Sequence, residues 1–240
     1  MQTIYHGKQT IAEGTMLFSF TKPEGFVFTA GQSIDMTLVD PPETDAEGNT
    51  RAYSLCSAPH EADLQVAMRM RDTAFKRVLG SLPVGAAVRI EGPFGSFCLH
   101  EDTTRPAVFL AGGIGVTPFR SMVLDARERG LPHTIYLFYS NRRPEDAAFL
   151  RELSELRTST FVFVPTMTNA GESQEVWTGE TGYITASMLQ KYVVGNTRPV
   201  FYLAGPEPMV TAMRAMLQSA GVSGDDVRFE EFSGYPNTTK

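Results

Sequence analysis

The sequence predicts a chain of two halves, an antiparallel β half followed by an α/β half built on a mostly parallel sheet. In the first hundred residues, apolar and polar side chains alternate with period two, as in residues 33–39 and 64–70. After about residue 106, apolar segments alternate with helical ones, beginning with the apolar residues 107–111. Strands that alternate with helices are typical of a parallel sheet covered on both faces.

Turn residues separate the short strands of the first half, at residues 23–25, 41–42 and 92–95. Short strands between turns favour an antiparallel sandwich or barrel, which we expect over residues 1–102. One short helix is expected at residues 74–79.

The second half, residues 106–240, follows a short charged segment at residues 101–105. Thr117 and Pro118 predict a helix start, with the threonine as N-cap and the proline at the first helical position. Strands are expected at residues 107–111, 134–140, 161–166, 200–204 and 227–231, and helices at 117–130, 144–156 and 206–220.

The composition is that of an ordinary globular protein. The 240 residues are 42% hydrophobic and 20% charged. This composition argues against a disordered chain, and the chain is long enough to bury a sizeable core. The net charge of -6, without a Lys/Arg run, is against nucleic-acid binding and polybasic membrane docking. No apolar stretch approaches the roughly 20 residues of a membrane span. The first ten residues lack a signal peptide's apolar region, so we expect a cytoplasmic protein.

Metal and nucleophile sites have little support in the sequence. Cys56 and Cys98 have no metal-ligand spacing, so no metal site is expected. The four histidines have no carboxylate or cysteine spaced for a metal and are interpreted as surface residues. They are His6, His60, His100 and His133.

The strongest local signal is AGGIGVTP at residues 111–118. Glycines between a strand and a helix let a ligand approach the backbone, and the helix N-terminus offers N–H groups to a phosphate. A tight turn without a ligand is the alternative. A second strand–glycine–helix turn, AGPEP at 204–208, would lie at the same sheet edge. The pair favours a cleft for an extended ligand.

Two segments of the first half could bind part of such a ligand. In RAYSLCS at 51–57, Arg51 could clamp a phosphate and Tyr53 could stack on a flat ring. Residues 69–76 bring cations to a helix start, which is a second possible phosphate-binding site. An ordinary edge strand and a solvated loop are the respective alternatives.

Six segments, taken in order, resemble the ferredoxin–NADP reductase superfamily: RAYSLCS at 51–57, RDTAFKRVL at 71–79, EGPFGSF at 91–97, AGGIGVTPF at 111–119, AGPEPM at 204–209 and EEFSGY at 230–235. The resemblance covers nearly the whole chain. It implies a flavin-binding antiparallel β-barrel followed by a five-stranded parallel NAD(P)-binding domain. The implied activity is that of an NAD(P)H-dependent flavoprotein reductase, with FAD as the commoner cofactor and FMN as the alternative.

The resemblance also implies roles for single residues. Ser54 is expected near flavin N5, and Glu230 and Phe232 at the open face of the flavin, so these three are the candidate catalytic residues. The candidate cofactor-binding residues are Arg51, Tyr53, Ser54, Ser57, Arg69, Thr73, Phe75, Gly112, Gly113, Gly115, Thr117, Arg142, Gly205, Pro206 and Phe232.

This sequence departs from the family pattern at two points. Ala204 stands where many members have a cysteine, and no C-x4-C-x2-C iron–sulfur segment is present. The electron acceptor is therefore expected to be a separate molecule, such as a ferredoxin or a haem protein.

The nucleotide preference is less sharply defined. Residues 165–172 contain no cation, and Glu172 and Glu175 would repel a 2′-phosphate, which favours NADH. Arg142 and Arg143 leave NADPH open. Two other functions are also open: a reductase that releases free reduced flavin, and a non-catalytic flavin-binding electron-transfer subunit of a larger complex.

Overall fold

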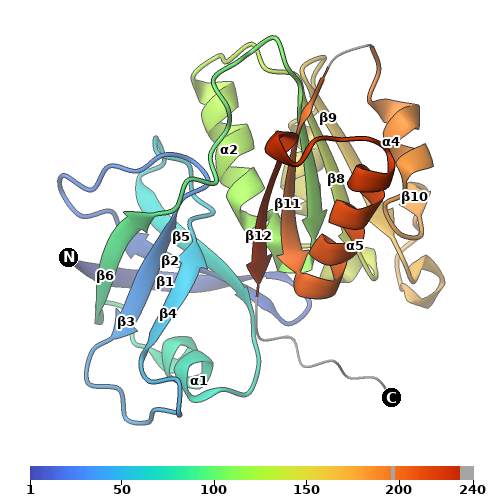
Figure 1. The fold of residues 1–240 in the computed structure, drawn as a ribbon. Helices are drawn as coiled ribbons and strands as arrows, with labels where there is room; N and C mark the ends of the chain where they lie inside the picture. Colours follow the sequence, from blue (N-terminus) through green and yellow to red (C-terminus); the bar gives the residue numbers. More distant parts are fainter. Residues whose placement is uncertain (196–197, 233–240) are drawn as a thin grey trace.

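Two six-stranded sheets lie side by side in the computed structural model, which describes residues 1–195 and 198–232 (Figure 1). Of the segments that carry the resemblance, residues 233–235 lie outside the described part of the chain. Within the described residues, no helix is both long and apolar enough to cross a membrane.

The first sheet is antiparallel and has the strand order β4-β3-β6-β1-β2-β5. Its elements are β1 (Gln2–Ala12), β2 (Thr15–Thr21), β3 (Ser33–Leu38), β4 (Thr50–Ser54), β5 (Asp63–Arg69), α1 (Ala74–Ser81) and β6 (Ala87–Phe94). The Cys56 N–H donates to the Gln65 carbonyl at 2.9 Å and brings the chain after β4 to β5. The two edge strands β4 and β5 thus lie close together, as in the predicted barrel.

Period-two alternation in the sequence accounts for the barrel interior. Along β3, Ile34, Met36 and Leu38 are buried, while the residues between them are partly exposed. The inward side chains of the other strands join them in one apolar core, to which α1 adds Phe75 and Leu79. Burying one face of each strand also defines the strand register, because a one-residue slip would expose the apolar set.

The second sheet is parallel and has the strand order β10-β9-β8-β7-β11-β12. Its strands are β7 (Ala107–Gly112), β8 (Ile135–Asn141), β9 (Phe161–Met167), β10 (Glu180–Thr181), β11 (Val200–Pro206) and β12 (Val227–Phe232). Its helices are α2 (Thr117–Glu128), α3 (Leu150–Glu155), α4 (Ala186–Tyr192) and α5 (Glu207–Ser219). α2 and α3 pack on one face of this sheet, and α4 and α5 on the other.

The second half differs from the sequence-based prediction at three points. The two-residue β10 makes six strands where the resemblance implied five. The helix expected at 144–156 is divided into a 3-10 turn (Pro144–Asp146) and α3, because Phe149 adopts a left-handed conformation with φ of 59°. Thr117 is not an N-cap: it is the first residue of α2, and its hydroxyl donates to the Ile114 carbonyl.

A packed junction joins the two halves. Phe97, in the segment after β6, lies with its ring centroid 5.7 Å from both Phe119 of α2 and Tyr202 of β11. Leu17, Cys56 and other barrel residues belong to the same buried cluster as one face of the parallel sheet. The barrel and the parallel sheet therefore bury a common core.

Two of the four histidines contradict the prediction that all of them lie on the surface. His100 and His133 are only 8% and 4% exposed, whereas His6 and His60 are exposed. The ring nitrogens of His100 lie 2.9 Å from the Tyr202 hydroxyl and 3.0 Å from the Arg105 carbonyl. His133 Nε2 lies 2.8 Å from the His100 carbonyl. These hydrogen bonds satisfy both ring nitrogens of His100 and Nε2 of His133, whereas His133 Nδ1 is buried without a partner among the described residues.

We expect this cluster to make the stability of the fold depend on pH. Burial lowers the pKa of His100 from its ordinary value of 6.5. The hydrogen bond with the Arg105 backbone works in the opposite direction, and the charges of His133, Arg228 and Arg105 lower the pKa further. Below pH 6.5 the unfolded chain therefore binds a proton that the folded chain resists, so the free energy of unfolding falls as the pH drops.

Urea unfolding at several pH values checks this expectation. The difference between the wild type and His100→Gln should vary with pH below 6.5. Exposed His60→Gln is the surface control, and the variation of the His100→Gln difference should exceed that of this control. Equal pH dependence in all three proteins would contradict the account.

Candidate functional site

The parallel sheet has a topological switch point between β7 and β11. These strands are neighbours, with Ala111 opposite Ala204, whereas β8 and β12 lie on their outer sides. α2, which follows β7, packs on one face of the sheet, and α5, which follows β11, packs on the other. A crevice outside the carboxyl ends of such strands is the usual ligand site of an open parallel sheet. The two glycine turns do meet at one sheet edge, as predicted.

Close packing accounts for most of the glycines in these turns. A Cβ on Gly112 would lie 2.1 Å from Met209 Sδ, and one on Gly115 would lie 2.2 Å from the Ala204 carbonyl oxygen. The Cβ position of Gly205 is 3.2 Å from the backbone of Gly112. Gly113 is different, because it has φ of +53° and nothing lies within 4 Å of its Cβ position. Its backbone therefore borders open space.

A matched pair of variants separates these two roles. Gly115→Ala should lower the free energy of unfolding by roughly 3 kcal/mol, because the new methyl group overlaps the backbone of β11. Gly113→Ala should cost about 1 kcal/mol through its positive φ alone. Urea denaturation measures both values. A Gly115→Ala protein no less stable than Gly113→Ala would contradict this packing.

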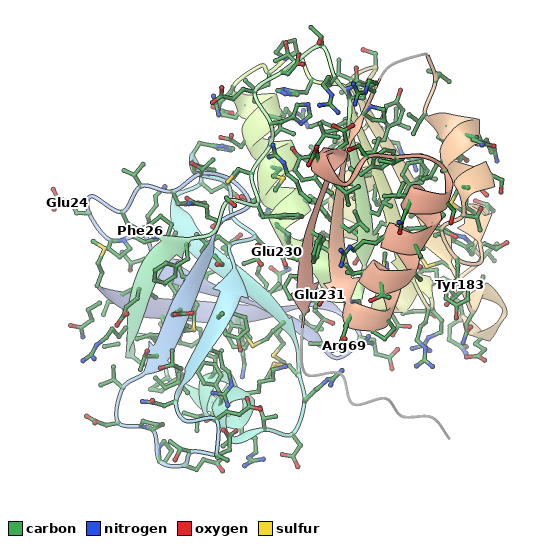
Figure 2. The ribbon with its side chains drawn as sticks, viewed as in Figure 1. Glu24, Phe26, Arg69, Tyr183, Glu230 and Glu231 are labelled. Carbon is green, nitrogen blue, oxygen red and sulfur yellow. The ribbon has the colours of Figure 1, made fainter. Side chains whose placement is uncertain are left out.

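The two halves meet through a hydroxyl and a carboxyl group. Ser54, the last residue of β4, donates a hydrogen bond of 3.5 Å to Glu230 Oε2 on β12. Figure 2 shows Glu230 and Glu231 on β12, at the boundary with the barrel. Burial raises the pKa of Glu230 to about 7, although the Ser54 hydrogen bond works in the opposite direction. The Glu230 carboxyl can therefore gain or lose a proton near neutral pH.

Aromatic rings lie next to Ser54 in the barrel. The Tyr53 ring is half-buried, with its centroid 6.0 Å from that of Phe75 on α1. Burial raises the pKa of Tyr53, so its hydroxyl stays neutral. Phe232, the last described residue of β12, is half-buried and lies in register with Pro206. Tyr53, Ser54, Glu230 and Phe232 thus come from the facing ends of β4 and β12.

The predicted phosphate residues lie near the start of α1. Thr73 is the N-cap of this helix, and its hydroxyl accepts a hydrogen bond from the Lys76 N–H at 3.4 Å. The Arg51 guanidinium lies over the Phe75 ring, 5.3 Å from its centroid. Arg51 is also paired with two carboxylates, Asp45 at 2.7 Å and Glu47 at 3.1 Å. These partners were not predicted, although Glu47 is four residues before Arg51.

Ser57 lies in the interior, at the junction between the barrel and α2. It is fully buried, its hydroxyl accepts a hydrogen bond from the Gln65 N–H, and its carbonyl accepts one from Ser121 of α2. The bond from Ser121 joins the barrel to the second half, whereas the bond from Gln65 lies within the barrel. Ser57 therefore has a structural role in this contact, and its contact with a cofactor stays a prediction.

Arg69 and Arg142 line a separate cavity of about 300 Å³ between the β1–β2 turn and the carboxyl ends of β8 and β9. Its lining residues are Glu13, Gly14, Arg69, Arg142, Arg143, Asp146 and Glu172. Asp146 pairs with Arg69 and Arg143, and Glu13 pairs with Arg143. Arg142 is exposed, and no ion pair of its side chain is found among the described residues. The cavity is therefore close to neutral overall.

Comparisons with known proteins agree with this architecture. Residues 109–215 match the family model described as the oxidoreductase NAD-binding domain. Ferredoxin–NADP reductase B of Sorangium cellulosum (strain So ce56) is 30% identical over 227 residues, which cover 89% of this chain and 90% of that protein. The reductase component of phenol 2-monooxygenase from Pseudomonas sp. (strain CF600) is 30% identical over 210 residues, which cover 85% of this chain and 58% of that protein.

Several such relatives are longer proteins, and the chain spans about three fifths of their length. Among solved structures, a ferredoxin NADP+ reductase from Neisseria gonorrhoeae with bound FAD and NADP superposes with a TM-score of 0.81. That match has 21% identity and covers 96% of this chain and 98% of the other. The order of the two sheets, the paired glycine turns and the relative matched over nearly its whole length lead to one conclusion: the chain belongs to the ferredoxin–NADP reductase family.

Proposed function

We propose that the protein is an NAD(P)H-dependent flavoprotein reductase. It would pass a hydride from NADH to a bound flavin and then electrons to a separate acceptor. The observation that carries this proposal is the contact between Ser54 of the barrel and Glu230 of the parallel sheet. The contact lies at the end of β4, next to Tyr53, where the barrel meets the sheet that carries the glycine turns. We also propose that residues 1–102 form the flavin-binding unit and residues 106–240 the nucleotide-binding unit.

The residues at the site fit a flavin. Tyr53 offers a half-buried aromatic face, and the capped start of α1, with Thr73, offers N–H groups to a phosphate. We propose FAD as the cofactor, since the solved relative described above contains it, and FMN as the alternative. When bound, a flavin accepts two electrons from reduced nicotinamide and can release them one at a time.

The residues of this chain would contribute orientation and proton control. Tyr53 would orient the ring, and half-buried Phe232 would limit the access of water to it. When the Glu230 carboxyl is protonated it can donate to Ser54 Oγ, which leaves the Ser54 hydroxyl proton free for the cleft. When it is ionised, Glu230 Oε2 accepts a hydrogen bond from the Ser54 hydroxyl, as in the described geometry. The state of this pair would change near pH 7, where Glu230 titrates.

The nucleotide would bind across the switch point. Gly112, Gly113 and Gly115 and the start of α2, including Thr117, would lie on one side, with Gly205 and Pro206 on the other. We propose the cavity around Arg142 for its adenosine half. Arg143 is already paired with Asp146 and Glu13, and Glu172 lies in the same lining, so a 2′-phosphate would meet little uncompensated positive charge. This arrangement supports the preference for NADH.

The acceptor proposed is a protein, either a ferredoxin-like protein or an oxygenase or haem component. Relatives are named as the reductase component of phenol 2-monooxygenase and the reductase subunit of glycine betaine monooxygenase, which supports an oxygenase component. Steady-state turnover with ferricyanide as an artificial acceptor tests the reductase and its coenzyme together. We expect a higher kcat/KM for NADH than for NADPH. A higher value for NADPH would overturn the coenzyme assignment, and no turnover with either nucleotide would favour a non-catalytic subunit.

A further inference from the structure

The loop between β3 and β4 contains a tight turn at residues 45–48, and this turn surrounds the guanidinium of Arg51. Its Nη1 donates to the carbonyls of Glu47, Gly48 and Thr50 at 3.0, 3.1 and 2.8 Å. Its Nη2 donates to Asp45 Oδ1 at 2.7 Å, and its Nε lies 3.1 Å from Glu47 Oε2. All three nitrogens of the group are therefore engaged by residues 45–50.

The same turn is attached to α1. Arg77 of α1 forms a two-bond contact with the Glu43 carboxylate, at 2.9 and 2.6 Å, and also bonds Asp72. The Asp45 carboxylate accepts hydrogen bonds from Arg51 and the Glu47 N–H, and the N–H of Ala74, the first residue of α1, interacts with it as well. The Asp45 carboxylate thus lies between an arginine and a helix start, which together are a favourable environment for an anion.

We propose that Asp45, assisted by Glu47, is an internal substitute for a flavin phosphate and weakens flavin binding by competing for Arg51 and the start of α1. This inference rests on the proposed flavin site. A phosphate can pair with Arg51 only if these carboxylates give up their hydrogen bonds. If they stay nearby, a phosphate also meets their like charge. Asp45 would thereby favour exchange of the flavin over permanent retention.

Competition of this kind is specific to phosphorylated flavins. FMN and FAD carry phosphate, whereas riboflavin has the same ring and no anionic group. Removing the charge of Asp45 should therefore tighten FMN and FAD binding and leave riboflavin binding unchanged. A general effect on the fold of the barrel would instead change the affinity for all three flavins.

Asp45→Asn is the sharpest variant, because the amide keeps an oxygen that can accept the Arg51 and Glu47 N–H bonds. We expect the Kd for FMN and FAD, measured by quenching of flavin fluorescence, to fall about five- to tenfold, and the Kd for riboflavin to stay constant. Glu47→Gln should act in the same direction. The matched control is Glu24→Gln, which removes one negative charge at an exposed turn on the upper left of the barrel, away from α1 (Figure 2).

The possible results separate the failure of this inference from that of the proposed function. If the wild type and every variant bind no flavin, the flavin site itself is wrong. If the wild type binds FMN or FAD and neither Asp45→Asn nor Glu47→Gln binds them more tightly, the competition is overturned. An equal gain in riboflavin affinity, or in Glu24→Gln, would overturn it as well.

Discussion

Ser54→Ala is expected to slow the reduction of bound flavin by NADH about 100-fold, the lower end of the range for a positioned proton donor. The variant removes the hydroxyl that contacts Glu230 Oε2 and leaves Tyr53, Phe75 and Thr73 in place. Flavin occupancy should therefore be unchanged. Stopped-flow absorbance of the anaerobic protein measures the rate, and the flavin-to-protein ratio measures occupancy.

The pH dependence of the same rate tests the partner of Ser54. Because burial raises the pKa of Glu230 to about 7, the wild-type rate should fall as the pH rises through 7. Above this pH the ionised carboxylate accepts a hydrogen bond from the Ser54 hydroxyl, which is then less available to the flavin. Glu230→Gln should abolish this pH dependence of the rate. Ser33→Ala, which removes the hydroxyl opposite Ser54 on β3, is the control and should retain both rate and pH profile. A normal rate in Ser54→Ala would remove this pair from the mechanism.

Arg120→Met is expected to lower the free energy of unfolding by about 3–5 kcal/mol, the typical cost of breaking a buried ion pair. The Arg120 guanidinium is buried and bonds Glu152 of α3 at 2.8 and 2.9 Å. It also bonds the barrel residue Glu61 and the Cys56 carbonyl. Methionine would remove the cation that pairs with both Glu152 and Glu61 and the donor to the Cys56 carbonyl, and Glu61 would keep only the hydrogen bond from the Ala58 N–H.

Urea denaturation compares this variant with a surface control. Arg151 pairs with Glu155 on α3 but is 93% exposed along its side chain, so Arg151→Ala should change stability little. The methionine variant should also lose contact between the halves, seen as faster proteolysis between residues 95 and 106. Equal stability of the two variants would contradict a structural role for Arg120.

The architecture was predictable because each half has its own hydrophobic period. Strict alternation in residues 33–38 requires one buried face, and the fully buried β7 is a continuous apolar run, as a central parallel strand must be. The division of the helix expected at 144–156 was not predictable from periodicity. It depends on the left-handed conformation of Phe149, a residue type that does not favour that conformation.

Those parts of the candidate site that lie within a local sequence motif were predictable. The glycine turns and the RAYS segment lie at strand ends that the topology brings to one side of the molecule. The burial of His100 was missed because its partner Tyr202 is 102 residues away in the sequence. The hydrogen bond from Ser121 to the Ser57 carbonyl was missed for a similar reason, since it exists only once the two halves pack together.

The acidic partners of Arg51 also could not be predicted from the sequence motif alone. The sequence contains Asp45 and Glu47 close by, but only the turn at Asp45–Gly48 brings both carboxylates onto the guanidinium. A cation in a sequence motif was therefore interpreted as available for a phosphate, whereas the folded chain already pairs it. Local charge patterns predict the residues of a binding site better than they predict its competing contacts.

We propose that this chain transfers a hydride from a reduced nicotinamide nucleotide to a flavin at the Ser54–Glu230 contact. Anaerobic titration of the flavin-loaded protein with NADH, followed by flavin absorbance, tests it most directly. We predict complete bleaching at one equivalent of NADH, and a slower or weaker response to NADPH. A firmly bound flavin that neither nucleotide bleaches would contradict the claim.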